Sequence, residues 1–245
     1  GPSMAIHVAI VEDEEDAVLT LKNYLERYSK ENDVSFTIDT FSSPVLLLER
    51  YKPVYDIIYM DIQMPDINGM EAARRLRTLD EQVLLIFVTN LAQYAIAGYE
   101  VSALDYILKP VQYYSFALKL SRAVWRIDYG KKVPIDISTR IGTVRINLCD
   151  VKYIEIQDHL LTYHTFDGPY SGLGTMSKLE KELGSQGFAR CSSSCMVNLA
   201  CAQRVKGYTL FLKTGEELRI SQPRKKRFMQ LLSQYTASDQ ATGES

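Results

Sequence analysis

The chain has 245 residues, of which 46% are hydrophobic and 24% are charged. This composition excludes a fibrous or largely disordered protein, and the length predicts two globular domains with buried cores. The longest purely apolar run covers residues 83–88, about a third of what a membrane-spanning helix needs. No secretion signal is visible, so we expect a cytoplasmic protein.

The two halves of the chain carry opposite net charge. Residues 4–126 hold 12 Lys and Arg against 18 Asp and Glu, a net charge of −6, whereas residues 133–235 hold 14 against 9, a net charge of +5. An acidic half joined to a basic half predicts that only the second half meets a polyanion.

All four cysteines lie in the second half of the chain. They form no CxxC pair, and no His stands at zinc-finger spacing from them. This pattern favours reduced thiols that pack as small apolar groups. A redox switch among Cys191, Cys195 and Cys201 is the alternative interpretation.

The first half alternates short apolar runs with helical patterns. Strands are predicted at 6–11, 34–41, 55–60, 83–88 and 103–108. Helices are predicted at 16–28, 45–51, 70–76, 92–98 and 113–126. Ser43 before Pro44 is typical of a helix start. Five strands alternating with five helices predict an α/β domain over 4–127, with a parallel doubly wound sheet.

The second half follows a short polar linker, which we place at 128–132. Strands are predicted at 133–137, 143–147, 151–156, 160–165 and 208–213. Asp167-Gly168 marks a hairpin turn. Helices are predicted only at 175–183 and 224–232, so the second domain, 133–235, is mostly β. The small polar segment 236–245 is predicted to be disordered.

Side chains suited to phosphoryl chemistry follow the predicted strands of the first half. Glu12 and Asp13 follow the first strand, Asp61 the third, Thr89 the fourth and Lys109 the fifth. The carboxyl ends of parallel strands open onto one edge of a sheet, so we expect these groups to converge. Crowded carboxylates require a hard cation, for which Mg²⁺ is suited. Asp61 can then attack phosphorus, while the cation, the ammonium group and the hydroxyl each hold one transferred oxygen.

Four motifs carry a family resemblance: Val11-Glu12-Asp13, Met60-Asp61-Ile62-Gln63-Met64-Pro65, Val88-Thr89 and Leu108-Lys109-Pro110. With them, the first half resembles the receiver domain of bacterial two-component response regulators. The resemblance implies that Asp61 accepts phosphate from a histidine kinase. The Mg²⁺ ligands that it implies are Glu12, Asp13, Asp61 and, through its backbone carbonyl, Gln63. It also implies that Tyr106 swings inward when Thr89 moves toward the phosphate, although Tyr106 alone is typical of a half-buried strand tyrosine.

The second half resembles the LytTR DNA-binding domain, a mostly β module that inserts loops into successive major grooves. The stretches that carry this resemblance are 151–155, 163–168, 188–191, 197–199, 210–215 and 220–221. The residues implied to contact DNA are His164, Arg190, Ser194, Asn198, Gln222, Arg224 and Lys225. Taken alone, His164 is typical of a strand surface, Asn198 of a turn, and the basic run 224–227 of a solvated helix face.

The second half also departs from the family pattern. Ser192 and Ser193 stand where His and Arg are usual, Cys195 where an aromatic residue is usual, and Gln222 where an Arg usually reaches a base. Losing that Arg removes a guanine contact of about 1–3 kcal/mol, and Gln reads adenine instead. The DNA sequence recognised is therefore left open.

Three functions follow from these observations. The first is a transcription regulator in which phosphorylation of Asp61 favours homodimers that bind repeated half-sites in promoter DNA. The second is a phosphorelay or protein-binding module that no longer reads DNA, which the missing His and Arg would explain. The third is a phosphatase-like hydrolase, but no second acid is placed as a general acid, so we expect no enzymatic turnover.

Overall fold

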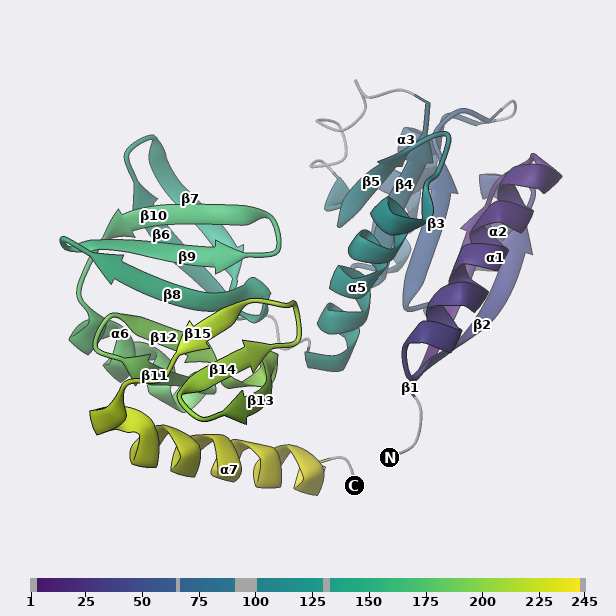
Figure 1. Cartoon of the computed structure of the whole chain (residues 1–245). Helices are drawn as coiled ribbons and strands as arrows, with labels where there is room; N and C mark the ends of the chain where they lie inside the picture. Colours follow the sequence, from purple (N-terminus) through teal and green to yellow (C-terminus); the bar gives the residue numbers. More distant parts are fainter. Residues whose placement is uncertain (1–3, 65–66, 91–100, 130–132, 243–245) are drawn as a thin grey trace. The chain divides into compact units, whose positions relative to one another are not determined.

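The structure, a computed structural model, divides into two compact units, residues 1–128 and 129–245 (Figure 1). Each unit is considered by itself. The residues that the structure describes are 4–64, 67–90, 101–129 and 133–242.

The first unit contains a five-stranded parallel sheet in the order β2-β1-β3-β4-β5. Its strands are β1 (Met4–Val11), β2 (Val34–Phe41), β3 (Ile57–Asp61), β4 (Leu84–Thr89) and β5 (Asp105–Leu108). Its helices are α1 (Glu15–Glu31), α2 (Pro44–Glu49), α3 (Gly69–Leu79) and α5 (Tyr113–Tyr129). This confirms the predicted parallel α/β fold. The helix predicted at 92–98 lies outside the described residues.

Helices cover both faces of this sheet (Figure 1). Side chains alternate along a strand, so Ile10 of β1 packs in one core with α1 and α5, while Val11 packs in the other core with α2 and α3. Tyr59 and Met60 of β3 divide in the same way. The central strands are therefore buried on both faces. The predicted polar residues lie where the strands end, along the edge of the sheet that their carboxyl ends form.

The second unit is mostly β, as predicted (Figure 1). Its main sheet is antiparallel in the order β10-β9-β8-β12-β11, with a separate β13-β14-β15 sheet and a β6-β7 pair. The strands are β6 (Pro134–Thr139), β7 (Gly142–Asn147), β8 (Val151–Gln157), β9 (Leu160–Thr165), β10 (Gly168–Leu173), β11 (Phe188–Ser192), β12 (Cys195–Asn198), β13 (Ala202–Lys206), β14 (Thr209–Leu212) and β15 (Glu217–Arg219). The helices are α6 (Met176–Leu183) and α7 (Lys225–Thr242), and short 3-10 turns include η4 (Leu199–Cys201) and η5 (Gln222–Arg224).

The core of this second unit lies between the main sheet and α6. Ile154 of β8, Met196 of β12 and Leu179 of α6 are all buried in one cluster. Thr175 caps α6, because its hydroxyl oxygen accepts from the amide of Lys178 at 3.3 Å. This packing fixes the strands that carry His164, Arg190 and Asn198.

Two boundaries differ from prediction. Helix α5 continues to Tyr129, so the expected linker 128–132 begins inside a helix. The disordered tail is wrong for residues 236–242, because α7 continues to Thr242. Thr236 donates its hydroxyl to the carbonyl of Leu232 at 2.9 Å, and a helix already nucleated gains a hydrogen bond with each added residue.

No helix among the described residues is long and apolar enough to span a membrane.

Candidate functional site

The polar residues predicted to converge do follow the carboxyl ends of neighbouring strands. Glu12 comes directly after β1, Asp61 ends β3, Thr89 ends β4 and Lys109 comes directly after β5. The amide of Lys109 donates to the carbonyl of Thr89 at 2.9 Å, which extends the β4–β5 pairing by one residue. The Lys109-Pro110 peptide bond is cis. The sheet itself therefore brings these groups to one edge.

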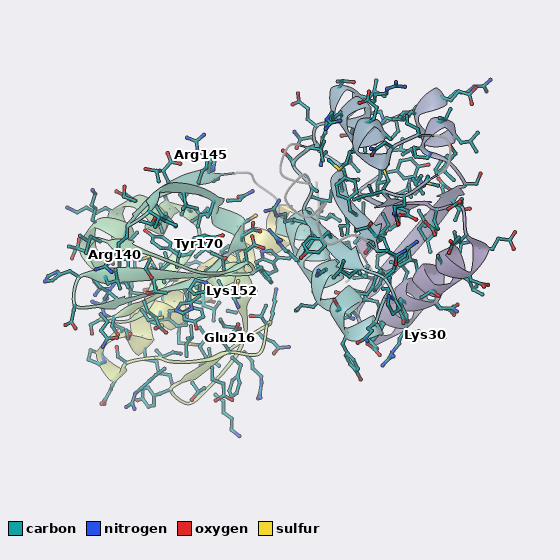
Figure 2. All side chains as sticks on the ribbon, turned by 90° about the horizontal axis from the view of Figure 1, so that it is seen from above. Lys30, Arg140, Arg145, Lys152, Tyr170 and Glu216 are labelled. Atoms are coloured by element: carbon teal, nitrogen blue, oxygen red, sulfur yellow. The ribbon has the colours of Figure 1, made fainter. Side chains whose placement is uncertain are left out.

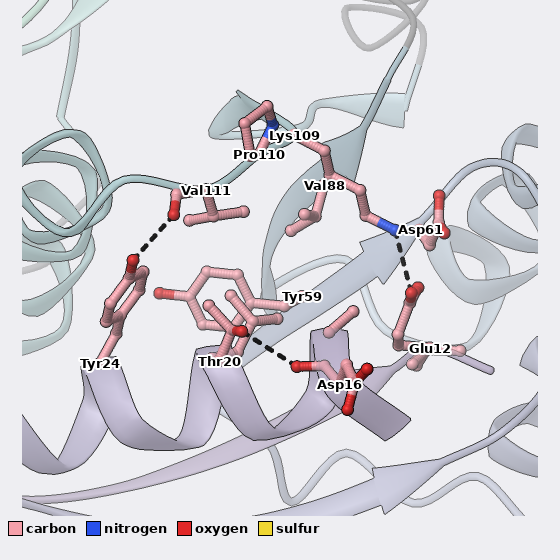
Figure 3. A pocket seen from close by; sticks show the side chains of 13 residues that line it. Glu12, Asp16, Thr20, Tyr24, Tyr59, Asp61, Val88, Lys109, Pro110 and Val111 are labelled. Atoms are coloured by element: carbon pink, nitrogen blue, oxygen red, sulfur yellow. Dashed lines mark hydrogen bonds and ion pairs between the residues drawn. The ribbon is translucent and has the colours of Figure 1, made fainter. Parts of the chain in front are cut away.

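Lys109 joins two buried carboxylates at this edge. Its Nζ lies 2.9 Å from Oε1 of Glu12 and 2.9 Å from Oδ2 of Asp61 (Figure 3). Both acids are 5% exposed. Burial lowers the pKa of Lys109, but the hydrogen bonds to the two acids outweigh it and raise the pKa overall. The ammonium group is therefore held in its charged form beside Asp61.

Three carboxylates make this edge acidic. Oxygens of Glu12, Asp13 and Asp61 lie within 4.8 Å of one another. Oε2 of Glu12 is buried and has no hydrogen-bond partner among the described residues. Burial, followed by the interaction with Asp61, raises the pKa of Glu12 above its ordinary value. An all-oxygen donor set with an unsatisfied buried oxygen fits a hard divalent cation such as Mg²⁺.

Close contacts hold the backbone that follows Asp61, and one of these contacts requires glycine at position 69. The amide of Gln63 donates to Oδ1 of Asp61 at 3.0 Å, and the amide of Gly69 donates to the carbonyl of Ile62 at 3.1 Å. A Cβ on Gly69 would lie 2.6 Å from Cα of Ile62 and 2.8 Å from the carbonyl oxygen of Asp61. Gly69 was not among the predicted site residues. The only signal for it in the sequence is Asn68-Gly69, where Asn68 caps α3.

The two predicted switch residues differ in their surroundings. Thr89 is completely buried at the end of β4. Tyr106 on β5 is half-buried and packs against the core on the α2 and α3 side of the sheet. The ammonium of Lys119 lies 4.9 Å from the centre of its ring. In this conformation Tyr106 is a half-buried strand tyrosine, and its movement stays a prediction.

A cavity of about 330 Å³ adjoins the acidic edge (Figure 3). Its polar end is formed by Glu12, Asp61 and Lys109. The rest is lined by α1, by the segment after β5 and by residues of β1, β3 and β4. Tyr24 of α1 donates its hydroxyl to the carbonyl of Val111 at 2.8 Å. The cavity therefore reaches the acidic edge from the side of α1.

Two of the predicted base readers are engaged within the second unit. His164 stacks on Tyr153 with ring centres 4.2 Å apart, and its Nε2 is buried 3.7 Å from a carboxylate oxygen of Glu155. Asn198 is 6% exposed; its Nδ2 donates to the carbonyl of Val151 at 3.0 Å and its Oδ1 accepts from the amide of Ala200 at 3.1 Å. In this conformation Asn198 acts as the turn residue at the start of η4.

Arg190 supports the β11–β12 hairpin. Its guanidinium donates to Oε2 of Glu180 at 3.0 Å and to the carbonyl of Ser193 at 2.8 Å. This second bond fixes the turn between β11 and β12, where Ser194 is exposed. The amide of Ser221 donates to the carbonyl of Cys191 at 2.8 Å, which attaches the segment before η5 to the same hairpin.

The remaining predicted DNA contacts are accessible. Gln222 is exposed, and Arg224 and Lys225 are partly exposed where η5 meets α7. The ammonium of Lys225 lies 4.3 Å from the centre of the Tyr208 ring, which orients it at the start of α7. The side chains of this region therefore present one amide and two basic groups to a partner.

An ion pair connects the main sheet of the second unit to its β13-β14-β15 sheet. Nζ of Lys152 on β8 lies 2.6 Å from Oε1 of Glu216, which precedes β15 (Figure 2). Burial raises the pKa of Glu216, but hydrogen bonds from Lys152 and Thr214 lower it overall. The carboxylate is therefore held charged between the sheets.

The first unit, with its parallel sheet and buried acidic edge, is a signalling domain of the receiver class. Residues 8–119 match the response regulator receiver domain family, and residues 142–233 match the LytTr DNA-binding domain family. Among solved structures, the non-phosphorylated HemR receiver domain from Leptospira biflexa is 25% identical and covers 49% of this chain and 94% of that one, with a TM-score of 0.43.

Relatives match both units together. The sensory transduction protein LytT of Bacillus anthracis is 28% identical over 250 residues, which cover 93% of this chain and 99% of that protein. An uncharacterized response regulatory protein of Yersinia pestis is 31% identical over 202 residues, 79% of this chain and 82% of that protein. The chain therefore belongs to the two-component response regulators that combine a receiver domain with a LytTR DNA-binding domain, and it is a transcription regulator of this family.

Proposed function

We propose that Asp61 accepts a phosphoryl group from a histidine kinase and that this modification controls DNA binding. The observation that carries the proposal is the position of Lys109, whose ammonium lies 2.9 Å from both Glu12 and Asp61. A carboxylate is a competent nucleophile toward phosphorus. A fixed cation beside it offsets the charge that develops on the phosphoryl oxygens during transfer.

The acidic edge also supports a role for Mg²⁺. Glu12, Asp13 and Asp61 would hold the ion, with the backbone carbonyl of Gln63 as a further ligand. When bound, Mg²⁺ neutralises phosphoryl oxygens and orients them for transfer. The residues of the chain then keep the phosphoryl group in place: Lys109 holds one oxygen, and the Thr89 hydroxyl is suited to a second.

Phosphorylation adds negative charge at the edge where Thr89 ends β4, and Tyr106 lies on the neighbouring strand β5. A charge change of this kind biases a two-state element, and we assign that element to Thr89 and Tyr106. We infer that the phosphorylated receiver pairs with a second copy. Two DNA-binding domains would then bind repeated half-sites in promoter DNA, with the second domain gaining affinity from its raised effective concentration.

For the DNA interface, we favour the accessible residues. Gln222 and Ser194 are exposed and suited to base contacts, with Gln directed to adenine. Arg224 and Lys225 stand at the start of α7, where basic side chains and a helix N-terminus both attract phosphate. Arg190 positions the hairpin. His164 and Asn198 would read bases only if they gave up their contacts to Tyr153 and Val151.

The test compares wild type with Asp61→Asn. A duplex is first selected from a random-sequence library, and its affinity is then measured over a salt series with and without phosphoramidate as phosphodonor. Wild type should bind more tightly after treatment, whereas Asp61→Asn should not respond. Asp33→Asn, at an exposed carboxylate in the same unit, should respond as wild type does. Equal affinities for treated and untreated wild type would refute control by phosphorylation.

The engagement of His164 and Asn198 keeps a second function in consideration, a relay or protein-binding module whose second domain lacks sequence-specific readout. The same selection separates the two. Enrichment of one motif supports transcription control, and a library that stays random after selection supports the relay.

A further inference from the structure

Two of the four thiols lie next to each other. Cys191 is in β11 and Cys195 begins β12, and Sγ of Cys191 donates to the carbonyl oxygen of Cys195 at 3.7 Å. Hydrogen bonding between the two side chains lowers the pKa of the Cys191 thiol and raises that of Cys195. Cys191 is fully buried and Cys195 is 8% exposed.

A β-bulge brings these thiols together. Arg190 pairs with Met196 and Ser192 pairs with Cys195, so Cys191 is the extra residue of β11. In a bulge, two residues of one strand face one residue of its partner. Cys191 and Ser192 therefore both lie opposite Cys195.

The geometry points to an intramolecular disulfide between Cys191 and Cys195, formed by a hydroperoxide, as a modification site that controls DNA binding. β11 is the outer strand of its sheet, and local opening of part of a fold costs less free energy than global unfolding. Cys149 and Cys201, the other two thiols, lie in η2 (Leu148–Asp150) and in η4, away from the hairpin turn.

The reaction balances with the peroxide as the only co-reactant. The Cys191 thiolate attacks one peroxide oxygen, the O–O bond breaks, and the alkoxide takes up the thiol proton and leaves as the alcohol. Sγ of Cys195 then attacks the sulfenic sulfur, the S–O bond breaks, and the hydroxide leaves as water with the Cys195 proton. Two thiols are oxidised by two electrons, and the hydroperoxide is reduced to an alcohol and water.

The bond would change the hairpin that faces DNA. It holds two sulfur atoms at about 2 Å and removes the hydrogen bond from Cys191 to the carbonyl of Cys195. The carbonyl of Cys191 holds Ser221, and Arg190 holds Ser193. A shift at Cys191 is therefore passed to the turn with Ser194 and to the segment before Gln222. This consequence rests on the proposed DNA-binding function.

The experiment treats the reduced full-length chain with tert-butyl hydroperoxide and then alkylates the remaining thiols. Mass spectrometry with fragmentation should show Cys149 and Cys201 alkylated, and Cys191 and Cys195 joined with the loss of two hydrogens. Affinity for the selected duplex should fall roughly tenfold, as expected for the loss of one base contact, and a thiol reductant should restore it.

Single-cysteine substitutions test which two thiols form the bond. Cys191→Ser and Cys195→Ala should each lose the bond and the response to peroxide, with folding verified by circular dichroism, whereas Cys149→Ser should keep both. Full alkylation of all four thiols after treatment, or a bond to Cys201, would overturn the assignment. Unchanged affinity in the oxidised chain would overturn control of DNA binding. A reduced chain that binds no duplex would refute the proposed DNA-binding function, while the thiol measurement would still decide the disulfide.

Discussion

The ammonium of Lys109 stabilises two neighbouring buried carboxylates at the candidate site. Glu12 and Asp61 are almost fully buried, and the same ammonium contacts both. Without it, like charges would face each other away from solvent, and the transferred phosphoryl group would lose a fixed cation.

Replacement of Lys109 by Met should therefore slow phosphorylation of the chain by roughly a hundredfold or more. Intact mass followed over time with phosphoramidate measures the rate. Lys30→Met is the matched control, because Lys30 is 75% exposed and pairs with exposed Glu26, so its rate should equal that of wild type. Equal rates for Lys109→Met and wild type would remove Lys109 from the mechanism.

Asn198 shows a structural role where a base contact was predicted. Its amide joins the carbonyl of Val151 to the amide of Ala200 in a buried position. Asn198→Ala should cost about 2–3 kcal/mol in the free energy of unfolding, since two buried groups lose their partner. Gln222→Ala should instead keep wild-type stability and weaken DNA binding. Urea unfolding and duplex binding of both variants check this. A stable Asn198→Ala that binds DNA poorly would restore the base-reading role.

At the scale of elements, hydrophobic periodicity and helix-start signals in the sequence were enough to predict the strands and the described helices of the first unit. The prediction for 34–41 agrees in full with β2, and Ser43 caps α2 by accepting from the amide of Val45 at 3.1 Å. Each strand of a parallel sheet ends at the same edge, so placing the strands also placed Glu12, Asp61, Thr89 and Lys109. Site prediction here followed from topology.

The second unit was less predictable for physical reasons. β10 contains two glycines and a proline, which depress strand propensity, and it depends on its pairing with β9. β12 pairs with β8, a partner forty or more residues earlier, and no local pattern predicts such a contact. The burial of Asn198 and the stacking of His164 depend on these pairings, so neither could be read from the sequence.

The first residue of helix α3, Gly69, lies so close to the backbone of Asp61 and Ile62 that no Cβ atom would fit there. Gly69→Ala should destabilise the first unit by about 1–3 kcal/mol, because the backbone at Asp61 and Ile62 must move, and should slow phosphorylation. Gly184→Ala is the control, since a Cβ added there would meet no atom within 4 Å and the φ of Gly184 is −59°. Thermal unfolding and phosphorylation rates of both variants test this. A wild-type rate and stability for Gly69→Ala would contradict the close approach.

The Lys152–Glu216 pair connects elements and predicts a pH dependence. The folded pKa of Glu216 is depressed from its ordinary 4.5, so its stabilisation is present above that pH and is lost as pH falls through the folded value. Glu216→Gln should be about 1–2 kcal/mol less stable than wild type near pH 7, and the difference should shrink in acid. Urea unfolding across pH measures it, with exposed Glu217→Gln as control. A difference that stays constant with pH would contradict this account.

At the scale of the whole molecule, the candidate phosphoryl site and the predicted DNA contacts lie in different units. The acidic first unit carries the candidate phosphoryl site, and the basic second unit carries the accessible amide and basic groups. This division agrees with a family in which a receiver domain is joined to a DNA-binding domain.

The central claim is that Asp61 receives the phosphoryl group. Reduction of the phosphodonor-treated chain with borohydride converts an aspartyl phosphate into homoserine, and peptide mapping then locates it. The account predicts homoserine at position 61 in wild type and none in Asp61→Asn. Homoserine at another aspartate, or an unmodified position 61 in phosphorylated wild type, would contradict it.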